Sequence, residues 1–276
     1  MSTSVRPAAV AGLFYPKDPR DLAQTVDRLL QDASLARGEA RVGRVKGVIA
    51  PHAGYVYSGP IAATAYDRLR AGSDREKVRR VVLMGPTHRA YVRGLALAGV
   101  EAFETPLGRI PVDLEAVALV SSLPQVVTSP AAHAREHSLE VHLPFLQRLF
   151  GTDFALVPFA VGEATPEEVA EVLDRLWGGD DTRVVISSDL SHFLSYRDAF
   201  RVDSETAKHI LALDPVDGDH ACGARPLNGL LALARRRQVR LELLDLRSSG
   251  DTAGTRDEVV GYGAFLLREG EPGGAS

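Results

Sequence analysis

The chain has 276 residues, of which 45% are hydrophobic and 25% charged, and its formal net charge is −4. A weakly acidic chain of this kind offers no electrostatic reason to bind nucleic acid. No stretch approaches the ~20 apolar residues that cross a bilayer, and the first residues lack the basic start and apolar core of a signal peptide. The single cysteine, Cys222, excludes an intrachain disulfide. We therefore expect a cytoplasmic protein that binds neither nucleic acid nor membrane.

Short apolar runs rich in Val, Ile and Leu alternate with amphipathic segments along the chain. Runs such as 184–186 are apolar throughout, which predicts an α/β fold with a mostly buried central sheet flanked by helices. A turn at 105–108 between two short extended pieces predicts an antiparallel excursion, so the sheet should be mixed. In chain order we expect strand Val45–Ala50, helix Pro60–Arg70, strands Arg80–Met84 and Leu95–Gly99, the excursion Phe103–Val112, helices Leu114–Ser122 and Ser138–Phe150, strand Phe154–Ala160, helix Pro166–Trp177, strand Arg183–Ser187, helices Arg197–Leu213 and Pro226–Arg237, and strands Arg240–Leu246 and Val260–Leu267.

Neither an internal repeat nor a polar linker divides the sequence, and α/β folds of roughly 200–250 residues often form one domain. We therefore expect a single domain over residues 1–276, with an ordered core from about residue 5 to 268 and a flexible tail at 269–276. Two helices carry clear start signals. Thr165 precedes a helix that opens with Pro166 and two glutamates, and Asp113 caps the helix that follows it.

Three of the expected strands are followed by polar residues that could bind a ligand. His52 follows the first strand, His88 follows the second, and Asp189 and His192 follow a later one. In open α/β sheets, ligands bind beyond the carboxyl ends of the strands, where the loops of neighbouring strands converge. If these strands are neighbours, the four side chains meet in one place. Imidazole together with carboxylate suits zinc, iron or manganese.

A single histidine after a strand is more often a hydrogen-bonded loop residue than a metal ligand. Three such strand endings in a chain with eight histidines favour a shared metal site instead. The proline and glycine residues around each histidine favour it too, because they fix tight turns through which a ligand can approach.

A further cluster lies at residues 136–142, where His137, Glu140 and His142 surround the start of the expected helix 138–150. His142 falls five residues after His137 and so points to a different face, which excludes the zinc-protease pattern of two histidines four residues apart. Two interpretations stay open. Either His137 and Glu140 face the pocket as part of a substrate wall, or Glu140 reaches back to cap the start of the helix.

Cys222 lies just before the expected helix 226–237. A helix N-terminus lowers the pKa of a thiol and favours the thiolate, which is the form that acts as a nucleophile or binds metal. The alternative is a small buried apolar residue, as isolated cysteines usually are. The neighbouring glycine and polar residues favour the reactive interpretation, and His220 is a weaker candidate of the same kind.

Seven short motifs, taken together, resemble the Memo family, whose bacterial and archaeal members are also named AmmeMemoRadiSam system protein B. They run in order from near residue 6 to about 266, so the resemblance covers almost the whole chain. The family is similar in fold to the class III extradiol dioxygenases, which hold non-haem iron(II) at the edge of a mixed sheet. The motifs are Val10–Pro16, Ala50–Tyr55, Gly85–His88, Glu136–His142, Ser187–His192, Cys222–Pro226 and Val260–Ala264.

The resemblance implies that His52, His88 and Cys222 bind one non-haem iron(II) or copper ion per chain. Asp189 and His192 would then stand beside the metal as catalytic residues, with His192 in the place of an acid/base histidine. The dioxygenases use a carboxylate where this chain has Cys222, and a thiolate is softer, donates more charge and can itself be oxidised. The substrate-binding residues that we predict are Tyr55, His137, Glu140 and Arg225.

These implications support a Memo-like metal-binding protein whose site is redox-capable and acts on a small substrate or on oxygen. True extradiol dioxygenase activity is a second hypothesis, although a fold analogy alone is a weak reason to transfer an activity. The third hypothesis is a non-catalytic pocket for a peptide or a partner, because the family name records an association with a radical-SAM protein. A vestigial site with purely structural histidines completes the alternatives.

Overall fold

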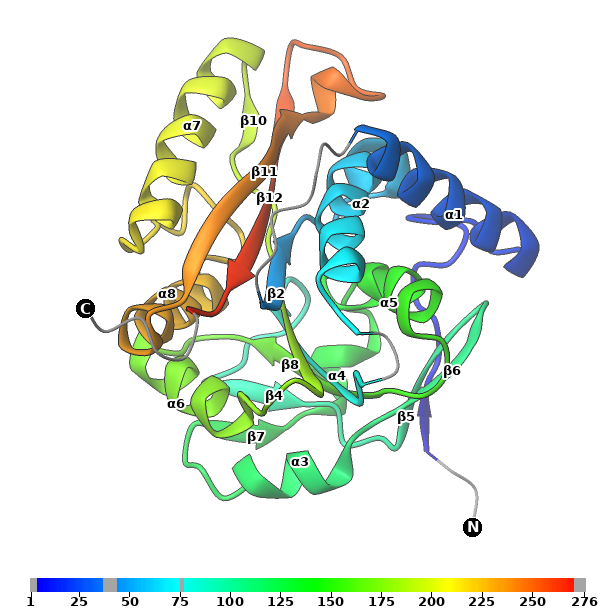
Figure 1. The fold of residues 1–276 in the computed structure, drawn as a ribbon, viewed down its shortest axis with the longest axis vertical. Helices are drawn as coiled ribbons and strands as arrows, with labels where there is room; N and C mark the ends of the chain where they lie inside the picture. Colours follow the sequence, from blue (N-terminus) through cyan, green and yellow to red (C-terminus); the bar gives the residue numbers. More distant parts are fainter. Residues whose placement is uncertain (1–3, 37–43, 75–76, 271–276) are drawn as a thin grey trace.

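The computed structural model describes residues 4–36, 44–74 and 77–270, along which helices and strands alternate (Figure 1). The predicted tail at 269–276 lies outside the described residues from residue 271 on, and the single domain stays a prediction. The strands are β1 Val5–Arg6, β2 Val45–Ala50, β3 Arg80–Pro86, β4 Leu95–Leu97, β5 Ala102–Thr105, β6 Gly108–Pro111, β7 Val126–Thr128, β8 Ala155–Val161, β9 Thr182–Ser187, β10 His192–Leu194, β11 Arg240–Ser248 and β12 Val259–Arg268. The helices are α1 Pro19–Ala36, α2 Tyr55–Ala71, α3 Leu114–Val120, α4 Pro130–Ala134, α5 Leu143–Phe150, α6 Pro166–Leu176, α7 Tyr196–Ala212 and α8 Ala224–Arg237, with 3-10 turns η1 Glu140–His142 and η2 Ser249–Asp251.

The main sheet is mixed and flanked by helices, which confirms the predicted fold class. Its described strands follow the order β10-β12-β2-β9-β3-β8-β4-β7, and β11 also pairs with β12. The central strands β2, β9, β3 and β8 run parallel to one another. Antiparallel pairs complete the sheet at both ends, between β12 and β2 and between β4 and β8. The carboxyl ends of the parallel strands therefore lie at one edge of the sheet.

Hydrophobic clusters lie on both faces of this sheet. Alternate residues along a strand point to opposite faces, so Val48 joins one cluster and Ile49 the other. Helices α1, α2 and α5 contribute buried residues to the first cluster, and α3, α6, α7 and α8 to the second. Figure 1 shows the two groups of helices on either side of the strands. Burial on both faces explains why the central strands read as continuous apolar runs.

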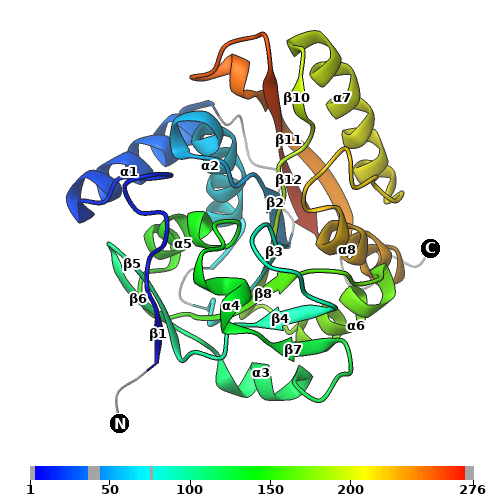
Figure 2. The same ribbon diagram turned by 180° about the vertical axis from the view of Figure 1, so that it is seen from behind.

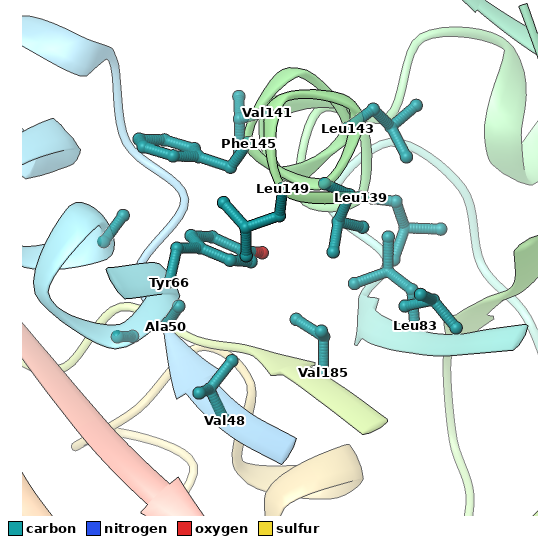
Figure 3. Packing of buried hydrophobic residues seen from close by; sticks show 14 of the residues in the cluster. Val48, Ala50, Tyr66, Leu83, Leu139, Val141, Leu143, Phe145, Leu149 and Val185 are labelled. Carbon is teal, nitrogen blue, oxygen red and sulfur yellow. The ribbon is translucent and has the colours of Figure 1, made fainter. Parts of the chain in front are cut away.

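Helix α5 is fixed to the sheet by the first cluster. Figure 3 shows Leu149 above Val48 and Val185, with the ring of Tyr66 beside them. Tyr66 stacks on Phe145, with ring centroids 4.9 Å apart and planes inclined by 9°. Full burial of one such apolar side chain contributes about 1.5–3 kcal/mol. This packing holds α5 and the residues just before it at the sheet edge where the candidate ligands gather.

A small second sheet anchors the amino-terminal segment. Strand β1 pairs in parallel with β5, and β5 pairs with β6 in an antiparallel hairpin. The hairpin confirms the excursion predicted from the turn at 105–108. Figure 2 shows these three strands together on one side of the molecule, away from α7 and β10. The segment that follows β1 then lies against the start of α2, where the backbone N–H of Tyr55 donates to the carbonyl oxygen of Phe14.

The start signals of α3 and α6 are confirmed, because Asp113 accepts a hydrogen bond from the backbone N–H of Ala116 and Thr165 forms a capping box with Glu168. Helix α1 was not predicted, although Leu22, Val26 and Leu30 recur at helical spacing on its buried face. Helix α2 begins at Tyr55, five residues before the predicted start at Pro60. Pro60 therefore lies inside the helix. None of the described helices is both long and apolar enough to span a bilayer.

Candidate metal centre

The site begins with three adjacent parallel strands. β9 lies between β2 and β3 and pairs with both of them. His52 follows β2, His88 follows β3, and Ser187 is the last residue of β9, two residues before Asp189. The neighbouring strands that a shared site requires are therefore present, and their loops converge at one edge of the sheet.

Three imidazoles form a group that could hold a metal ion. One nitrogen from each of His52, His88 and His137 lies within 4.8 Å of the other two. The ring centroid of His52 is 5.3 Å from that of His88 and 5.5 Å from that of His137. His88 and His137 stack with centroids 4.7 Å apart and planes inclined by 20°. His137, which we predicted from the sequence to bind substrate, is thus close enough to the predicted ligands His52 and His88 to share a metal ion with them.

His52 is the buried member of this group. Its side chain is 1% exposed, its backbone N–H donates to Oδ1 of Asp189 at 2.7 Å, and its Nδ1 lies 2.6 Å from Oγ of Ser187. Burial, reinforced by the nearby His88 and His137, lowers the pKa of His52 well below its ordinary value. The ring is therefore neutral at neutral pH, which is the form that binds metal.

His88 is more open to solvent, with 30% of its side chain exposed. Its Nδ1 lies 2.9 Å from Oε1 of Glu136, and its backbone N–H donates to Oε2 at 2.6 Å. Glu136 also accepts hydrogen bonds from the backbone N–H groups of His137 and Ser138. Burial alone raises the pKa of Glu136, but the hydrogen bonds from His88 and Ser138 outweigh it and lower the pKa to about 2. A carboxylate that receives Nδ1–H in this way leaves Nε2 for a metal.

His137 enters the group from the loop between α4 and η1. The ring of Phe14 lies 4.7 Å from its ring, and burial lowers the pKa of His137 to about 4. Its Nδ1 is buried without a hydrogen-bond partner among the described residues. The same Nδ1 lies 3.4 Å from Oε1 of Glu136, which is the nearby group of opposite charge. The donor set of neutral imidazoles thus fits a transition metal.

Cys222 lies beside His52, just before α8, and is not part of the group of three imidazoles. Its Sγ is 3.3 Å from Nε2 of His52 and accepts a hydrogen bond from the backbone N–H of Asp189 at 3.3 Å. A nitrogen and a sulfur bound to one tetrahedral ion are about 3.5 Å apart, so this spacing suits two ligands of the same ion. Burial, together with the charge of Asp189, raises the pKa of the thiol. The lowering that a helix N-terminus predicts is therefore wrong, because desolvation of the thiolate outweighs the helix dipole.

The two predicted catalytic residues follow β9. Burial raises the pKa of Asp189 to about 7, and the hydrogen bond from the backbone of His52 opposes this rise. His192 begins β10 and is close enough for its charge to lower the pKa of His52. Burial lowers the pKa of His192 itself, although a hydrogen bond with the backbone of Leu190 opposes the shift. Their catalytic roles stay predictions.

Glu140 serves the amino-terminal segment and does not face the pocket. Its carboxylate is fully buried, forms an ion pair with Arg6, and accepts hydrogen bonds from the backbone N–H groups of Ala9 and Val10 and from the hydroxyl of Tyr15. Both interpretations of Glu140 are thereby corrected, since it neither lines a substrate wall nor caps its own helix. The carboxylate that accepts from the loop before η1 is Glu136. The sequence feature that could have identified Glu136 is its position directly before His137.

The other two predicted substrate-binding residues differ in exposure. Tyr55 is 5% exposed, and its hydroxyl donates to the carbonyl oxygen of Val141 at 2.7 Å, so its polar atom is already paired within the core. Arg225 is 55% exposed in the first turn of α8, with its guanidinium 3.8 Å from the carboxylate of Glu163. Substrate contact by either residue stays a prediction.

Comparisons with known proteins decide the family. A family model described as Memo-like protein matches residues 6–266. This chain belongs to that family. A MEMO1 family protein of Methanopyrus kandleri is 35% identical over 290 residues, which cover 96% of this chain and 99% of that protein. A MEMO1 family protein of Methanosarcina acetivorans is 36% identical and covers 95% of this chain and 99% of its own length. The predicted membership of the Memo family is confirmed.

A solved structure supports the fold. An uncharacterized protein of Escherichia coli K12 superposes with a TM-score of 0.51 at 14% sequence identity, covering 81% of this chain and 99% of its own. At this identity the likeness concerns the arrangement of helices and strands alone.

Proposed function

We propose that this Memo-like chain holds one iron(II) or copper ion against His52 and His88 and supports redox chemistry on a small substrate or on oxygen. The observation that carries the proposal is the approach of three imidazole nitrogens to within 4.8 Å of one another, at the sheet edge where the parallel strands end. Bound there, the ion would supply one-electron chemistry and Lewis acidity.

The third ligand is supplied by Cys222 or by His137. The resemblance to the Memo family favours Cys222, and its Sγ lies 3.3 Å from the Nε2 of His52. The geometry of the imidazoles favours His137, whose ring stacks on His88. A thiolate is a soft ligand with a negative charge, and it would favour copper or a redox-active iron. A third imidazole would instead make all three protein ligands uncharged. The two assignments therefore differ in the spectrum of the bound metal.

Asp189 and His192 are the residues we assign to proton movement. Asp189 lies in the loop after β9 and His192 begins β10, and Asp189 receives a hydrogen bond from the backbone of His52. A carboxyl and an imidazole beside a metal ligand can hand a proton to a substrate held at the exposed side of His88. Loss of either side chain should reduce turnover and leave the metal content unchanged.

The test is the metal content of protein purified untagged and without oxygen, measured by elemental mass spectrometry. We expect near-stoichiometric iron or copper in the wild type and none in a His52→Ala/His88→Ala variant. The single variants Cys222→Ser and His137→Ala then assign the third ligand, with thermal unfolding as the control for folding. A wild type that takes up no metal even after reconstitution would contradict the proposal.

Recognition of a peptide or a partner protein, such as a component of a radical-SAM system, is the second candidate function. It is favoured by Phe193, which is 72% exposed and whose ring lies 5.8 Å from that of His192. Large aromatic side chains are enriched among the residues that contribute most to binding at protein interfaces. Metal-free protein that still binds such a partner, and loses it on Phe193→Ser, would support this function.

A further inference from the structure

Ser187, the last residue of β9, forms three buried hydrogen bonds through its hydroxyl group. Its side chain is fully buried, and its Oγ lies 2.6 Å from Nδ1 of His52 and 2.8 Å from Nε2 of His142. The same oxygen lies 2.6 Å from the carbonyl oxygen of Ser138. The three partners come from the loop after β2, from η1, and from the loop just before η1. One side chain at the sheet edge thus contacts all three segments.

The positions of the hydrogens follow from counting donors. A serine hydroxyl carries a single hydrogen, and a carbonyl oxygen can only accept. The hydrogen of Ser187 therefore goes to Ser138, and its Oγ accepts one hydrogen from each imidazole. His52 then carries its hydrogen on Nδ1 and His142 on Nε2. The remaining Nδ1 of His142 accepts from the hydroxyl of Tyr66 at 2.8 Å, so this buried network is satisfied throughout.

This assignment decides which nitrogen of His52 can bind a metal. A neutral imidazole with its hydrogen on Nδ1 has its lone pair on Nε2. That nitrogen lies 3.3 Å from Sγ of Cys222, on the side of the ring away from Ser187. The opposite tautomer would place an N–H where the ligand atom is needed. It would also leave Oγ of Ser187 without one of its two donors.

Ser187 also fixes the loop that carries His137. Its hydroxyl donates to the backbone of Ser138, the residue next to His137 in the chain. Gly85 of β3 packs so closely against this contact that a Cβ there would lie 2.9 Å from Oγ of Ser138 and 3.1 Å from Cβ of Ser187. The three hydrogen bonds of Ser187 therefore hold His52 and the His137 loop at a fixed separation.

We propose that Ser187 is a positioning residue of the metal site, which fixes the tautomer of His52 and ties this ligand to the loop of His137. The part of this inference that concerns metal affinity rests on the proposed function. The hydrogen-bond network belongs to the chain itself and can be tested without metal. Removal of a hydrogen-bonding partner of a ligating histidine typically weakens metal binding 10–100-fold.

The first measurement is the tautomer of His52 in metal-free wild-type protein, read from the long-range nitrogen–proton NMR correlations of its imidazole ring. We expect the hydrogen on Nδ1. A hydrogen on Nε2 would overturn the proposal. Because the wild type alone decides this point, the result stands even if a Ser187 variant fails to fold.

The second measurement compares Co(II) dissociation constants of the wild type, Ser187→Ala and Ser248→Ala, with Co(II) absorption as the signal. Ser248 is a matched control, since it is 6% exposed and its hydroxyl is hydrogen-bonded to Asp251 at 3.0 Å, away from the three histidines. We expect Ser187→Ala to bind Co(II) 10–100-fold more weakly, with His52 shifted toward the Nε2–H tautomer, and Ser248→Ala to match the wild type.

The outcomes separate the two proposals. A Ser187→Ala dissociation constant within about twofold of the wild-type value would overturn the positioning role. Failure of the wild type to bind Co(II) would instead count against the proposed function. In that case the NMR measurement still decides whether Ser187 sets the tautomer of His52.

Discussion

His52 and His88 follow β2 and β3, the two strands on either side of β9, and are held in contrasting ways. His88 is 30% exposed and its Nδ1 is paired with the charged carboxylate of Glu136. His52 is 1% exposed and its Nδ1 is paired with the neutral hydroxyl of Ser187. A carboxylate is tolerated beside His88 because four backbone and ring N–H groups satisfy it. In the dry surroundings of His52, a neutral partner fixes the ring without a buried charge.

The contrast indicates that the two sides of the site will respond differently to substitution. The His88 side depends on the carboxylate of Glu136 and on the segment between α4 and η1 that carries it, so loss of charge pairing there should strongly lower stability. The His52 side depends on shape and on hydrogen bonds between neutral groups. Substitutions there should therefore lower the free energy of unfolding by smaller amounts.

The largest effect is expected from Arg6→Met, on the His88 side. Arg6 forms a buried ion pair with Glu140 and donates to the carbonyl oxygens of His133 and Glu136. Removing one partner of a buried pair costs about 3–5 kcal/mol, because the remaining charge is left unpaired. Denaturant titration should show this loss. The exposed pair of Arg148 and Asp27 is the control, and Arg148→Met should cost about 0–1 kcal/mol.

The next effect is expected from Glu136→Gln. The substitution keeps the size of the side chain but replaces one accepting oxygen with an NH₂ group, which must face backbone N–H donors. We expect a loss of roughly 1–3 kcal/mol in the free energy of unfolding and weaker metal uptake, since His88 loses its charged partner. Glu167→Gln on the surface of α6 provides the comparison. Equal stability of the two variants would contradict the structural role of Glu136.

Gly85→Ala tests the contact between the two sides. The new Cβ would lie 2.9 Å from Oγ of Ser138 and 3.1 Å from Cβ of Ser187, and both neighbours are fully buried. Overpacking of this kind costs about 1–3 kcal/mol. We expect a lower melting temperature and weaker Co(II) binding from the same variant. Gly218→Ala, at a position where a Cβ meets nothing within 4 Å, should leave both measurements unchanged.

The smallest effect, expressed per pH unit, is the contribution of His142 on the His52 side to the pH dependence of stability. His133 and His137, whose pKa values burial also lowers, contribute to the same dependence. Burial lowers the pKa of His142 from its ordinary 6.5 to about 3. Between these values the unfolded chain binds a proton that the folded chain does not, so stability falls as the pH drops from 6.5 toward 3. The slope from one such group is about 1.4 kcal/mol per pH unit.

We expect the free energy of unfolding of His142→Gln to fall less steeply with decreasing pH than that of the wild type. Glutamine can hydrogen-bond to Ser187 and Tyr66 but does not titrate in this range. Urea unfolding at a series of pH values between 4 and 7 would measure the slope. Identical slopes for the wild type and His142→Gln would mean that His142 is protonated in the folded protein.

Much of the site was accessible from the sequence because its residues follow apolar strands directly. His52, His88 and Asp189 each lie two residues beyond a strand whose end can be read from its Val, Ile and Leu content. The placement of Glu140 could not be read in this way. Its partners Arg6 and Tyr15 lie 134 and 125 positions away in the chain, and no local pattern connects them.

The sequence by itself determined the alternation of strands and helices, the Memo-like family and the residues at the strand ends, because each depends on short-range spacing and on apolar runs. Only the tertiary structure decided that β9 lies between β2 and β3, and that His137 joins His52 and His88 while Glu140 is drawn to the amino-terminal segment. These outcomes depend on strand order and on which buried charges find partners. Both are settled by contacts between segments far apart in the chain.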